Sequence, residues 1–399
     1  MNKKTAWTTG STALLLFAVL GAHVGVWASQ LPAVADKASF SLGDIGLRLM
    51  VVSVASIVAS LLVGRVIDSL GRRVFSVLGL LVMAASFLLF GSSNLEGLMG
   101  MAIFLLFGVA IGILDVAVNT VGSDYERSLK RPLMIGLHGA FSAGAAVAAG
   151  LCALFLGIGS DGLLLTTGVL MFLSAVWVGF AKFPAMPSVE AESAEENIQP
   201  SNFKFFGLPL VIVAIGTICF FGDGILEGFA PLYFSSDLLN ASAELTALAV
   251  GSFHFASFAG RVVSAFVFAK FGRDLVIILW SGLGCGLSVT FFIAFTDSPY
   301  FALVGMVLAG FLLSPVIPTT YSALGRLGGT VSGRAISWLT SGSYAAFTVA
   351  PAVSGFVAQS SSLRTPIIIA GVCYIACAIF ALTALLNKAD APLKETVDA

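Results

Sequence analysis

Long apolar runs separated by short polar segments dominate this sequence from one end to the other. Nearly all of the charged residues fall between the runs rather than within them. A transmembrane helix needs about 20 mainly apolar residues. Twelve runs meet this requirement, near residues 9–30, 43–67, 74–92, 97–122, 133–157, 162–183, 205–233, 243–269, 275–296, 299–324, 332–358 and 364–387. The pattern predicts an all-α integral membrane protein with twelve transmembrane helices.

The scarcity of charge excludes a water-soluble fold. Only 10% of the residues are charged and 58% are hydrophobic, whereas a soluble domain carries about 25% charged residues. We therefore expect the lipid bilayer to be the main solvent of this chain. A net charge of −1 provides no basic field for binding nucleic acid. The five cysteines lie in apolar runs, where we interpret them as small buried residues, so we expect neither a metal site nor a cofactor.

The distribution of lysine and arginine predicts the orientation of the chain. An even number of spans places both termini on one side of the membrane, and cytoplasmic loops are enriched in basic residues. The segments on the side of the termini hold most of the lysines and arginines, whereas the segments on the other side hold only Lys37 and Arg364. We expect both termini in the cytoplasm and a multi-pass location in a bacterial inner membrane.

Residues 184–203 differ in composition from the rest of the chain. They are rich in proline and glutamate and poor in large apolar side chains, which is typical of a flexible linker. We interpret them as a cytoplasmic linker between an N-terminal six-helix bundle (1–183) and a C-terminal six-helix bundle (204–399) with a short cytoplasmic tail. Residues 64–73 and 265–273 share a spacing of small residues, glycine and arginine, so we expect the two bundles to be pseudo-symmetric.

The turn between the second and third spans carries the most specific motif. It reads Gly64-x3-Asp68-x2-Gly71-Arg72-Arg73. Gly64 would let another helix approach closely, and Gly71 would allow a tight turn. Asp68 would favour the N-terminus of a neighbouring helix. At this position in the chain, the motif resembles the signature loop of the major facilitator superfamily.

This resemblance implies a fold and a mechanism. It implies two bundles that rock about a central binding site, as secondary transporters of this superfamily do. In the family the helix terminus near the aspartate belongs to span eleven, which here begins near residues 332–334. The arginines would pair with acids below span four, here Asp124 or Glu126. The cluster would then latch the cytoplasmic side while the cavity faces outward, unless Arg72 and Arg73 serve only as topology determinants.

Three further stretches resemble a narrower bacterial group, the YbjJ-like branch. They are residues 27–33 in span one, 114–119 in span four and 137–144 in span five. The branch implies no particular substrate.

Spans four and five hold a candidate pair of ionisable residues. An ionisable group in the hydrocarbon region is costly unless it faces a partner or a wet cavity. Asp115 and His138 lie at similar depths from the same side, so their side chains could meet, with Asn119 on the Asp115 face. Such a pair could relay protons. The alternative is a hydrogen bond that only locks the two spans together.

Span seven carries two acidic residues one helical turn apart. Asp223 and Glu227 should repel each other, so one of them can stay protonated, and either is a second candidate proton carrier. The flanking glycines predict a bent or broken helix. Arg48 or Lys37 could supply a counterion, in which case a plain external salt bridge is the alternative.

Other polar and aromatic residues are candidates for lining a central cavity. Arg261 could bind an anionic substrate, pair with an acid or extend to the cytoplasmic interface. By resemblance, His23 and His254 lie at cavity-lining positions, although each could instead be a packed, hydrogen-bonded histidine. Candidates for stacking on or hydrogen bonding to a small polar ligand are Trp27, Gln30, Asn119, Phe141, Trp338 and Tyr344.

These features favour a monomeric secondary transporter of a small solute over an enzyme. The sequence has no Walker motif and no nucleotide-binding domain, which leaves an ion gradient or downhill flow as the driving force. We expect proton coupling and a sugar-like or other small polar substrate. Efflux of drugs or metabolites stays open as an alternative, as does a non-transporting role as a sensor or assembly partner.

Overall fold

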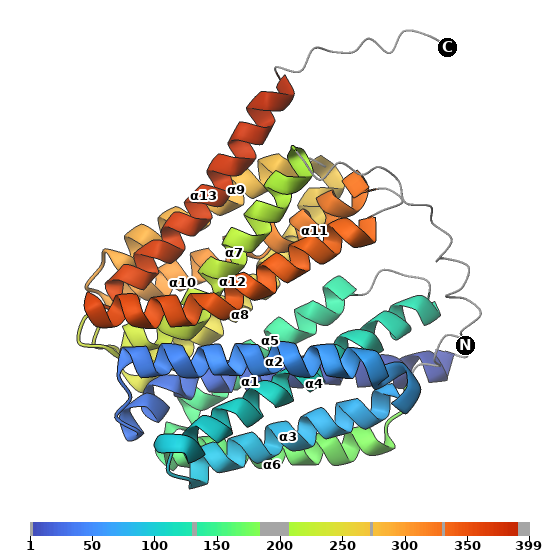
Figure 1. Ribbon diagram of the computed structural model, residues 1–399, viewed down its shortest axis with the longest axis vertical. Coiled ribbons are helices and arrows are strands. Elements are labelled where there is room, and N and C mark those ends of the chain that lie inside the picture. The colour runs from blue at the N-terminus through green and yellow to red at the C-terminus, as the bar shows by residue number, and fades with distance from the viewer. Residues whose placement is uncertain (1–2, 130–133, 184–206, 272–273, 329–331, 390–399) are drawn as a thin grey trace.

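The computed structural model describes residues 3–129, 134–183, 207–271, 274–328 and 332–389, and each regular element in these ranges is a helix (Figure 1). The first group of helices comprises α1 (Lys3–Lys37), α2 (Leu42–Leu70), α3 (Arg72–Ser92), α4 (Gly97–Leu129), α5 (Met134–Leu154), η1 (Leu156–Ile158) and α6 (Gly159–Phe180). The second group comprises α7 (Leu208–Ser235), α8 (Ala243–Phe271), α9 (Asp274–Leu287), η3 (Ser288–Ala294), α10 (Pro299–Leu313), α11 (Val316–Gly328), α12 (Ser332–Ser360) and α13 (Arg364–Ala389). The predicted linker, residues 184–203, lies outside the described residues.

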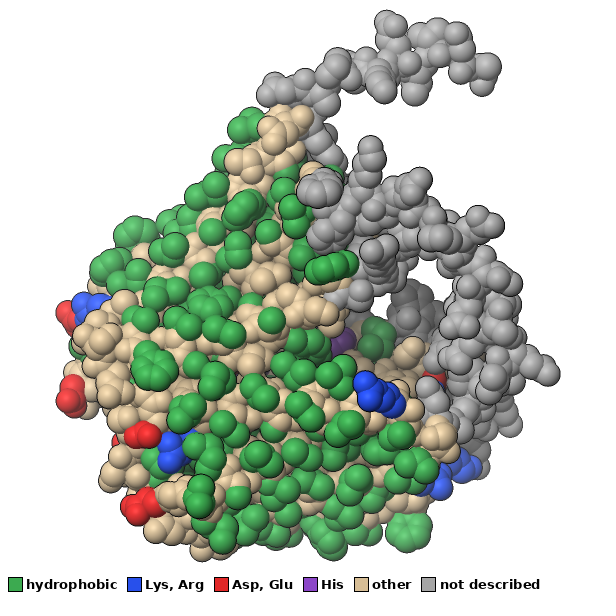
Figure 2. All heavy atoms as spheres, viewed as in Figure 1, with side chains coloured by type: hydrophobic (Ala, Val, Ile, Leu, Met, Phe, Trp, Pro, Cys, Tyr) green, Lys and Arg blue, Asp and Glu red, His purple; other side chains and the backbone are tan. Residues whose placement is uncertain are grey.

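The lateral surface of the molecule is suited to lipid. Ten helical segments in the described ranges are long and apolar enough to cross a membrane. Figure 2 shows hydrophobic side chains spread over the lateral face, with charged side chains gathered toward two opposite ends. Large apolar residues such as Leu62, Phe180 and Trp280 are exposed on the outside. Such exposure is unfavourable in water and favourable in a bilayer, which confirms the prediction of an all-α multi-pass membrane protein.

Most helix bounds agree with the apolar runs, but several helices differ. α1 runs from Lys3 to Lys37 and so extends beyond both ends of the predicted run, and the ninth run is divided into α9 and the π-helix η3. α4 continues to Leu129, beyond the predicted end near residue 122, because backbone hydrogen bonding carries the helix past the end of the apolar run. The tenth run is divided into α10 and α11 around Pro315, whose missing N–H cannot continue the helical ladder.

Of the two predicted possibilities for span seven, a bent or a broken helix, the break is wrong. α7 runs without interruption from Leu208 to Ser235. Its glycines serve helix packing instead. A Cβ on Gly222 would lie 2.9 Å from the ring of Tyr374 on α13, and one on Gly224 would lie 3.0 Å from the Cβ of Ala350 on α12. The missing side chains therefore let two neighbouring helices approach α7.

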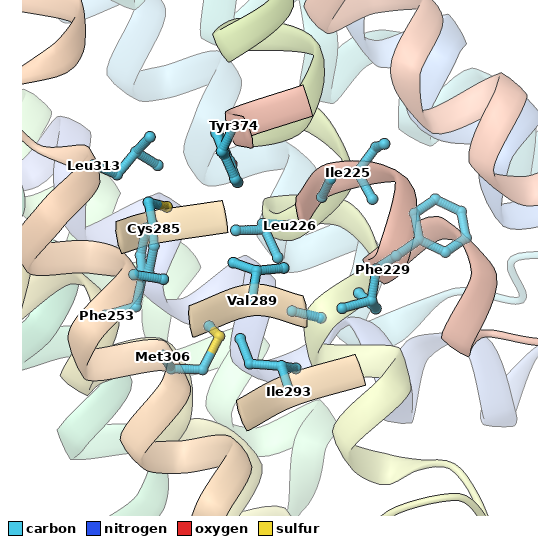
Figure 3. Packing of buried hydrophobic residues seen from close by; sticks show 14 of the residues in the cluster. Ile225, Leu226, Phe229, Phe253, Cys285, Val289, Ile293, Met306, Leu313 and Tyr374 are labelled. Carbon is cyan, nitrogen blue, oxygen red and sulfur yellow. The ribbon is translucent and has the colours of Figure 1, made fainter. Parts of the chain in front are cut away.

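The two groups of helices repeat the same packing scheme. In the first group, α1 packs on α5, α2 on α4 and α3 on α6; in the second, α7 packs on α12, α8 on α10 and α9 on α13. The two groups have largely separate hydrophobic cores. Figure 3 shows part of the core of the second group, where Leu226 of α7, Val289 of η3 and Met306 of α10 lie among its buried side chains. Each group thus has its own apolar centre.

The two groups meet closely at one end of the molecule, where α2 packs against α12. A Cβ on Gly46 would lie 2.6 Å from the carbonyl oxygen of Pro351. A Cβ on Gly355 would lie 2.6 Å from the carbonyl oxygen of Leu42. We call this end, where α2 begins and α12 ends, the closed end. The other end, where α6 ends and α7 begins, is the linker end.

At the linker end the two groups lie apart (Figure 1). The last turns of α2 have little cover there, with 63% of Leu61 and 59% of Leu70 exposed. A Cβ on Gly64 would meet no described atom within 4 Å. The surface between the two groups is hollowed on this side (Figure 2). The space between the groups therefore opens toward the linker end.

Candidate functional site

A cavity of about 290 Å³ lies between the two groups of helices. Both groups contribute to its wall: α1, α2, α4 and α5 from the first, and α7, α8, α10 and α12 from the second. The candidate site residues on the wall are His23, Trp27, Asp115, Phe141, Glu227, His254 and Tyr344. The sequence thus identified lining residues on six different helices, and the fold brings them to one place.

Aromatic rings form much of the cavity wall. Trp27 is held by the aromatic core of the first group, with its ring 4.8 Å from Phe107 and 4.9 Å from Phe90 between centroids. Phe253 and Phe347 add rings from the second group. A wall of this kind offers apolar surface and ring faces to a small ligand.

Asp115 is the centre of a hydrogen-bond network that joins the two groups. The Asn119 side-chain amide donates to Oδ1 of Asp115 at 3.0 Å and to its backbone carbonyl at 2.9 Å. The Tyr344 hydroxyl donates to Oδ2 of Asp115 at 3.4 Å. Because Asp115 lies on α4 and Tyr344 on α12, this contact spans the cavity from one group to the other.

The expected pair between Asp115 and His138 does not form in this structure. α4 packs mainly on α2 and α3, whereas α5 packs on α1 and α8. The His138 ring instead lies edge-on to Phe17, with 5.2 Å between centroids. Adjacency along the chain and similar depth were therefore insufficient, because the two side chains project from helices with different partners.

The two acids of α7 have different surroundings. Glu227 lines the cavity, and within the described part of the chain its carboxyl has no hydrogen bond or ion pair. Asp223 is absent from the cavity wall, and its Oδ1 accepts a hydrogen bond from the Tyr374 hydroxyl at 2.9 Å. The acid open to a ligand is therefore Glu227.

The basic residues considered as counterions for these acids are engaged elsewhere. Arg48 is buried, its Nη1 lies 3.4 Å from Oδ1 of Asp44, and its guanidinium lies 3.8 Å from the centroid of the Phe40 ring. Lys37 forms an ion pair with Asp161 of α6 at 2.8 Å. Neither basic side chain is part of the cavity wall.

The remaining polar candidates divide between the wall and its surroundings. His23 and His254 are buried and line the cavity, where His23 packs edge-on to Phe107. Arg261 reaches α5 of the other group, where Nη1 donates to the His138 carbonyl at 3.2 Å and to the Ser142 hydroxyl. Outside the cavity wall lie Gln30, Asn119, His138, Asp223, Arg261 and Trp338.

The motif between α2 and α3 is partly assembled. Gly71 has φ +96°, a conformation that glycine adopts readily and that the tight turn requires. Nε of Arg72 donates to Oδ2 of Asp124 at 2.8 Å, with both side chains buried, which confirms the predicted pairing with an acid below span four. Nη2 of Arg73 donates to the Ala181 carbonyl at 2.8 Å.

The rest of the predicted latch is less complete. The side chains of Asp68, Glu126 and Arg334 lie outside the described residues. Gly64, which we expected to receive a neighbouring helix, meets no described atom at its Cβ position. The part of the motif that lies within the first group is thus formed, while Gly64 meets no described atom at the linker end.

Several lining residues were not identified from the sequence. Small hydroxyls on α2 and α12, among them Ser53, Ser56 and Thr348, contribute to the wall. So do Pro231 of α7 and Pro351 of α12, both inside helices. A proline inside an apolar run is a signal that could have been used, because it removes a backbone hydrogen bond near a functional site. The hydroxyls carry no such signal.

Comparisons with known proteins agree with this architecture. A sequence profile of the Major Facilitator Superfamily matches residues 12–330 and 212–398. An uncharacterised MFS-type transporter of Yersinia pestis is 26% identical over 355 residues, which is 88% of each chain. An uncharacterised transporter of Sinorhizobium fredii is 25% identical over 382 residues, covering 92% of this chain and 95% of that one.

A solved structure supports the same assignment at the level of the fold. The crystal structure of the nucleoside transporter NupG matches with a TM-score of 0.68 and 14% identity, over 94% of this chain and 98% of NupG. At this identity the likeness concerns the fold alone. Because the family profile covers most of its length, the chain belongs to the Major Facilitator Superfamily.

Proposed function

We propose that this protein is a proton-coupled secondary transporter that moves a small polar solute by alternating access. The observation that carries the proposal is the cavity of about 290 Å³, lined by both groups of helices, closed at one end and open toward the other. A site of this kind becomes accessible from the other side if the two groups rock about it. In this conformation the solute would exchange through the linker end.

The proposal includes the membrane arrangement expected from the sequence. The chain would cross a bacterial inner membrane twelve times as two pseudo-symmetric six-helix bundles, with the linker 184–203 and both termini in the cytoplasm. The packing scheme repeated between the two groups supports the pseudo-symmetry. The cavity would then face the cytoplasm, and the unit would act as a monomer.

Kinship with the YbjJ-like branch also belongs to the proposal. The three stretches that resemble this branch, 27–33, 114–119 and 137–144, all contribute to the cavity wall: Trp27 and Ala28 from the first, Asp115 from the second and Phe141 from the third. The parts of the sequence that are most specific to the branch therefore surround the proposed site. Resemblance in these stretches supports a binding site shared with the branch, whereas resemblance confined to lipid-facing residues would not.

Glu227 and Asp115 are the proposed proton carriers. Both line the cavity from opposite groups, and a carboxylate in a low-dielectric wall needs a proton or a cationic partner. Aromatic walls combined with carboxyl, imidazole and hydroxyl groups suit a small metabolite with both polar and apolar parts. Uptake and efflux are equally compatible with this site.

The test is transport by the purified full-length protein in proteoliposomes. A thermal-shift screen of sugars, nucleosides, amino acids and amines first identifies a ligand, and its flux is then measured with and without an imposed pH gradient. We expect gradient-driven accumulation by the wild type and by Asp223→Asn, and its loss in Glu227→Gln and Asp115→Asn with folding intact. Full gradient-driven flux in the last two variants would refute these carriers. A protein that binds ligand but moves none would refute the transporter proposal.

A further inference from the structure

The cavity wall has an unbalanced set of charges. Two carboxyl groups, Asp115 and Glu227, line it, and the described wall contains no lysine or arginine. Two basic side chains outside the wall make other contacts: Arg261, whose charge also acts on Glu227, donates to α5, and Arg48 lies on Asp44. An anionic ligand would therefore meet two acids without a basic group to receive it.

We propose that the substrate of this cavity is a small organic cation, an ammonium group attached to an apolar body. This inference rests on the proposed function and names its substrate class. A buried carboxylate without a partner is strongly disfavoured, and a bound ammonium removes that penalty by forming a charge-assisted hydrogen bond. A neutral solute could not do this without a proton bound at the same time.

Glu227 is the residue that receives the ammonium group. The Asp115 carboxyl already accepts hydrogen bonds from Asn119 and Tyr344, whereas the Glu227 carboxyl accepts none from the described residues. Glu227 lies about two turns before the end of α7 at Ser235, on the side of the cavity toward the closed end. A cation entering from the linker end would thus reach it at the bottom of the cavity.

The rings of the wall suit the rest of such a ligand. Trp27, Phe107, Phe141, Phe253 and Phe347 surround the space from both groups. An ammonium over a ring face is attracted by the negative face of the ring, and the rings also cover an apolar body. Most of the wall is apolar, so a polyhydroxylated solute would lose more hydrogen bonds to water than the polar groups of the wall replace.

Cation and proton would compete for the same carboxyl group. The other titratable groups on the wall are Asp115, His23, His254 and Tyr344, and Asp223 and Arg261 lie on α7 and α8 just outside it. Binding of a cation would displace a proton from Glu227, so that cation and proton cross in opposite directions. Cation affinity should therefore rise with pH.

The experiment uses three probes of similar size that differ in charge: phenethylammonium, 2-phenylethanol and phenylacetate. Binding to the purified full-length protein is measured by calorimetry and thermal shift at two pH values. We expect saturable binding of the ammonium probe, weaker binding of the alcohol by about tenfold or more, and no binding of the carboxylate. Glu227→Gln should remove the preference for the cation over the alcohol. Glu96→Gln, which removes an exposed acid far from the wall, serves as the matched control.

Each outcome has a defined meaning. Equal affinity for the ammonium and the alcohol, tighter binding of phenylacetate, or an unchanged preference in Glu227→Gln would overturn the inference. Cation binding without any flux in proteoliposomes would sink the transporter proposal and leave the cation site standing. Proton-driven flux of a neutral solute, with no binding of the ammonium probe, would do the reverse.

Discussion

At the scale of single residues, the decisive property of each charge is whether its partner is buried with it. Arg72 and Asp124 form an ion pair with only 8% and 1% of their side chains exposed. Arg364 and Asp297 form a pair of similar length, 2.7 Å, but 85% of the Asp297 side chain is exposed. Water screens the second pair and not the first, so similar geometry has different energetic consequences.

We predict that Arg72→Ala destabilises the protein far more than Arg364→Ala. Removing Arg72 takes the cationic group away from the buried Asp124 carboxylate, which costs about 3–5 kcal/mol. Removing Arg364 breaks an exposed pair worth about 0–1 kcal/mol. Thermal unfolding of both variants in the same detergent would measure the difference. Equal shifts in melting temperature would contradict it, and partial recovery in the double variant Arg72→Ala/Asp124→Ala would show that the stranded charge is the cause.

The sequence identified seven of the wall residues but not their partners. Asp115 was found because an acid in an apolar run requires an explanation, and that reasoning holds for Glu227 too. The Asp115–Tyr344 contact could not be predicted, because it joins helices more than 200 residues apart, on α4 and α12. Depth along a helix follows from counting residues, whereas the neighbour that a side chain faces depends on how the helices pack.

At the scale of helices, glycines decide where two helices can touch. On α1, a Cβ at Gly21 or Gly25 would overlap backbone atoms of α5, so these glycines fix a contact inside the first group. Gly46 on α2 and Gly355 on α12 fix a contact between the groups at the closed end. Gly64, also on α2, makes no such contact with the described residues in this conformation. Gly46 and Gly64 thus lie on one helix at the two ends of the molecule, which would close in turn during the proposed transport cycle.

We predict opposite conformational effects of Gly46→Leu and Gly64→Leu. The first places a side chain against the Pro351 carbonyl and disfavours closure at the closed end. The second is tolerated in the present conformation and obstructs closure at the linker end. Access to the cavity can be followed in a background without the native cysteines, by labelling Ser53→Cys in sealed vesicles with a membrane-impermeant thiol reagent applied from either side.

The two variants are expected to differ in the side of the membrane from which the cysteine is labelled, rather than in the amount of labelling. Gly46→Leu should shift reaction of the cysteine toward the closed-end side, and Gly64→Leu should restrict it to the linker-end side. Identical labelling of both variants would mean that the two glycines do not control closure. The unchanged Ser53→Cys background is the reference for both.

Helices were the best predicted level of this structure, for a physical reason. A backbone in a bilayer must satisfy its hydrogen bonds internally, so a long apolar run leaves helix as the available choice. The interruption at Pro315 and the extension of α4 were less accessible, because hydropathy reports the lipid boundary rather than the last hydrogen bond of a helix. Glycine in α7 was misread as a break because its packing role depends on helices distant in sequence.

At the scale of the whole molecule, the structure is two apolar units joined by a limited set of contacts. Each group has a largely separate core, and the contacts between them are strongest where α2 meets α12 and α5 meets α8. The cavity lies between these units rather than inside either one. Rocking one unit against the other would therefore change access to the cavity while leaving both cores intact, which is what alternating access requires.

Cross-linking the closed end should stop this motion, which is the most direct test of the scheme. The Gly43 amide on α2 donates to Oε1 of Gln359 on α12 at 2.9 Å, so cysteines at these two positions would join the two groups. With the native cysteines replaced, we expect oxidation of Gly43→Cys/Gln359→Cys to abolish flux of the solute identified in the screen, and reduction to restore it.

A matched pair within one group provides the control. Gly91 of α3 and Leu165 of α6 lie at the same end of the molecule, but both belong to the first group, and a Cβ on Gly91 would lie 2.8 Å from the Cγ of Leu165. Oxidation of Gly91→Cys/Leu165→Cys should leave flux nearly unchanged, because it joins two helices that move together. If the disulfide between the groups forms completely and flux continues at the same rate as in the protein with reduced cysteines, the two groups do not separate at the closed end during transport. A rigid passage through the protein would then replace rocking as the mechanism.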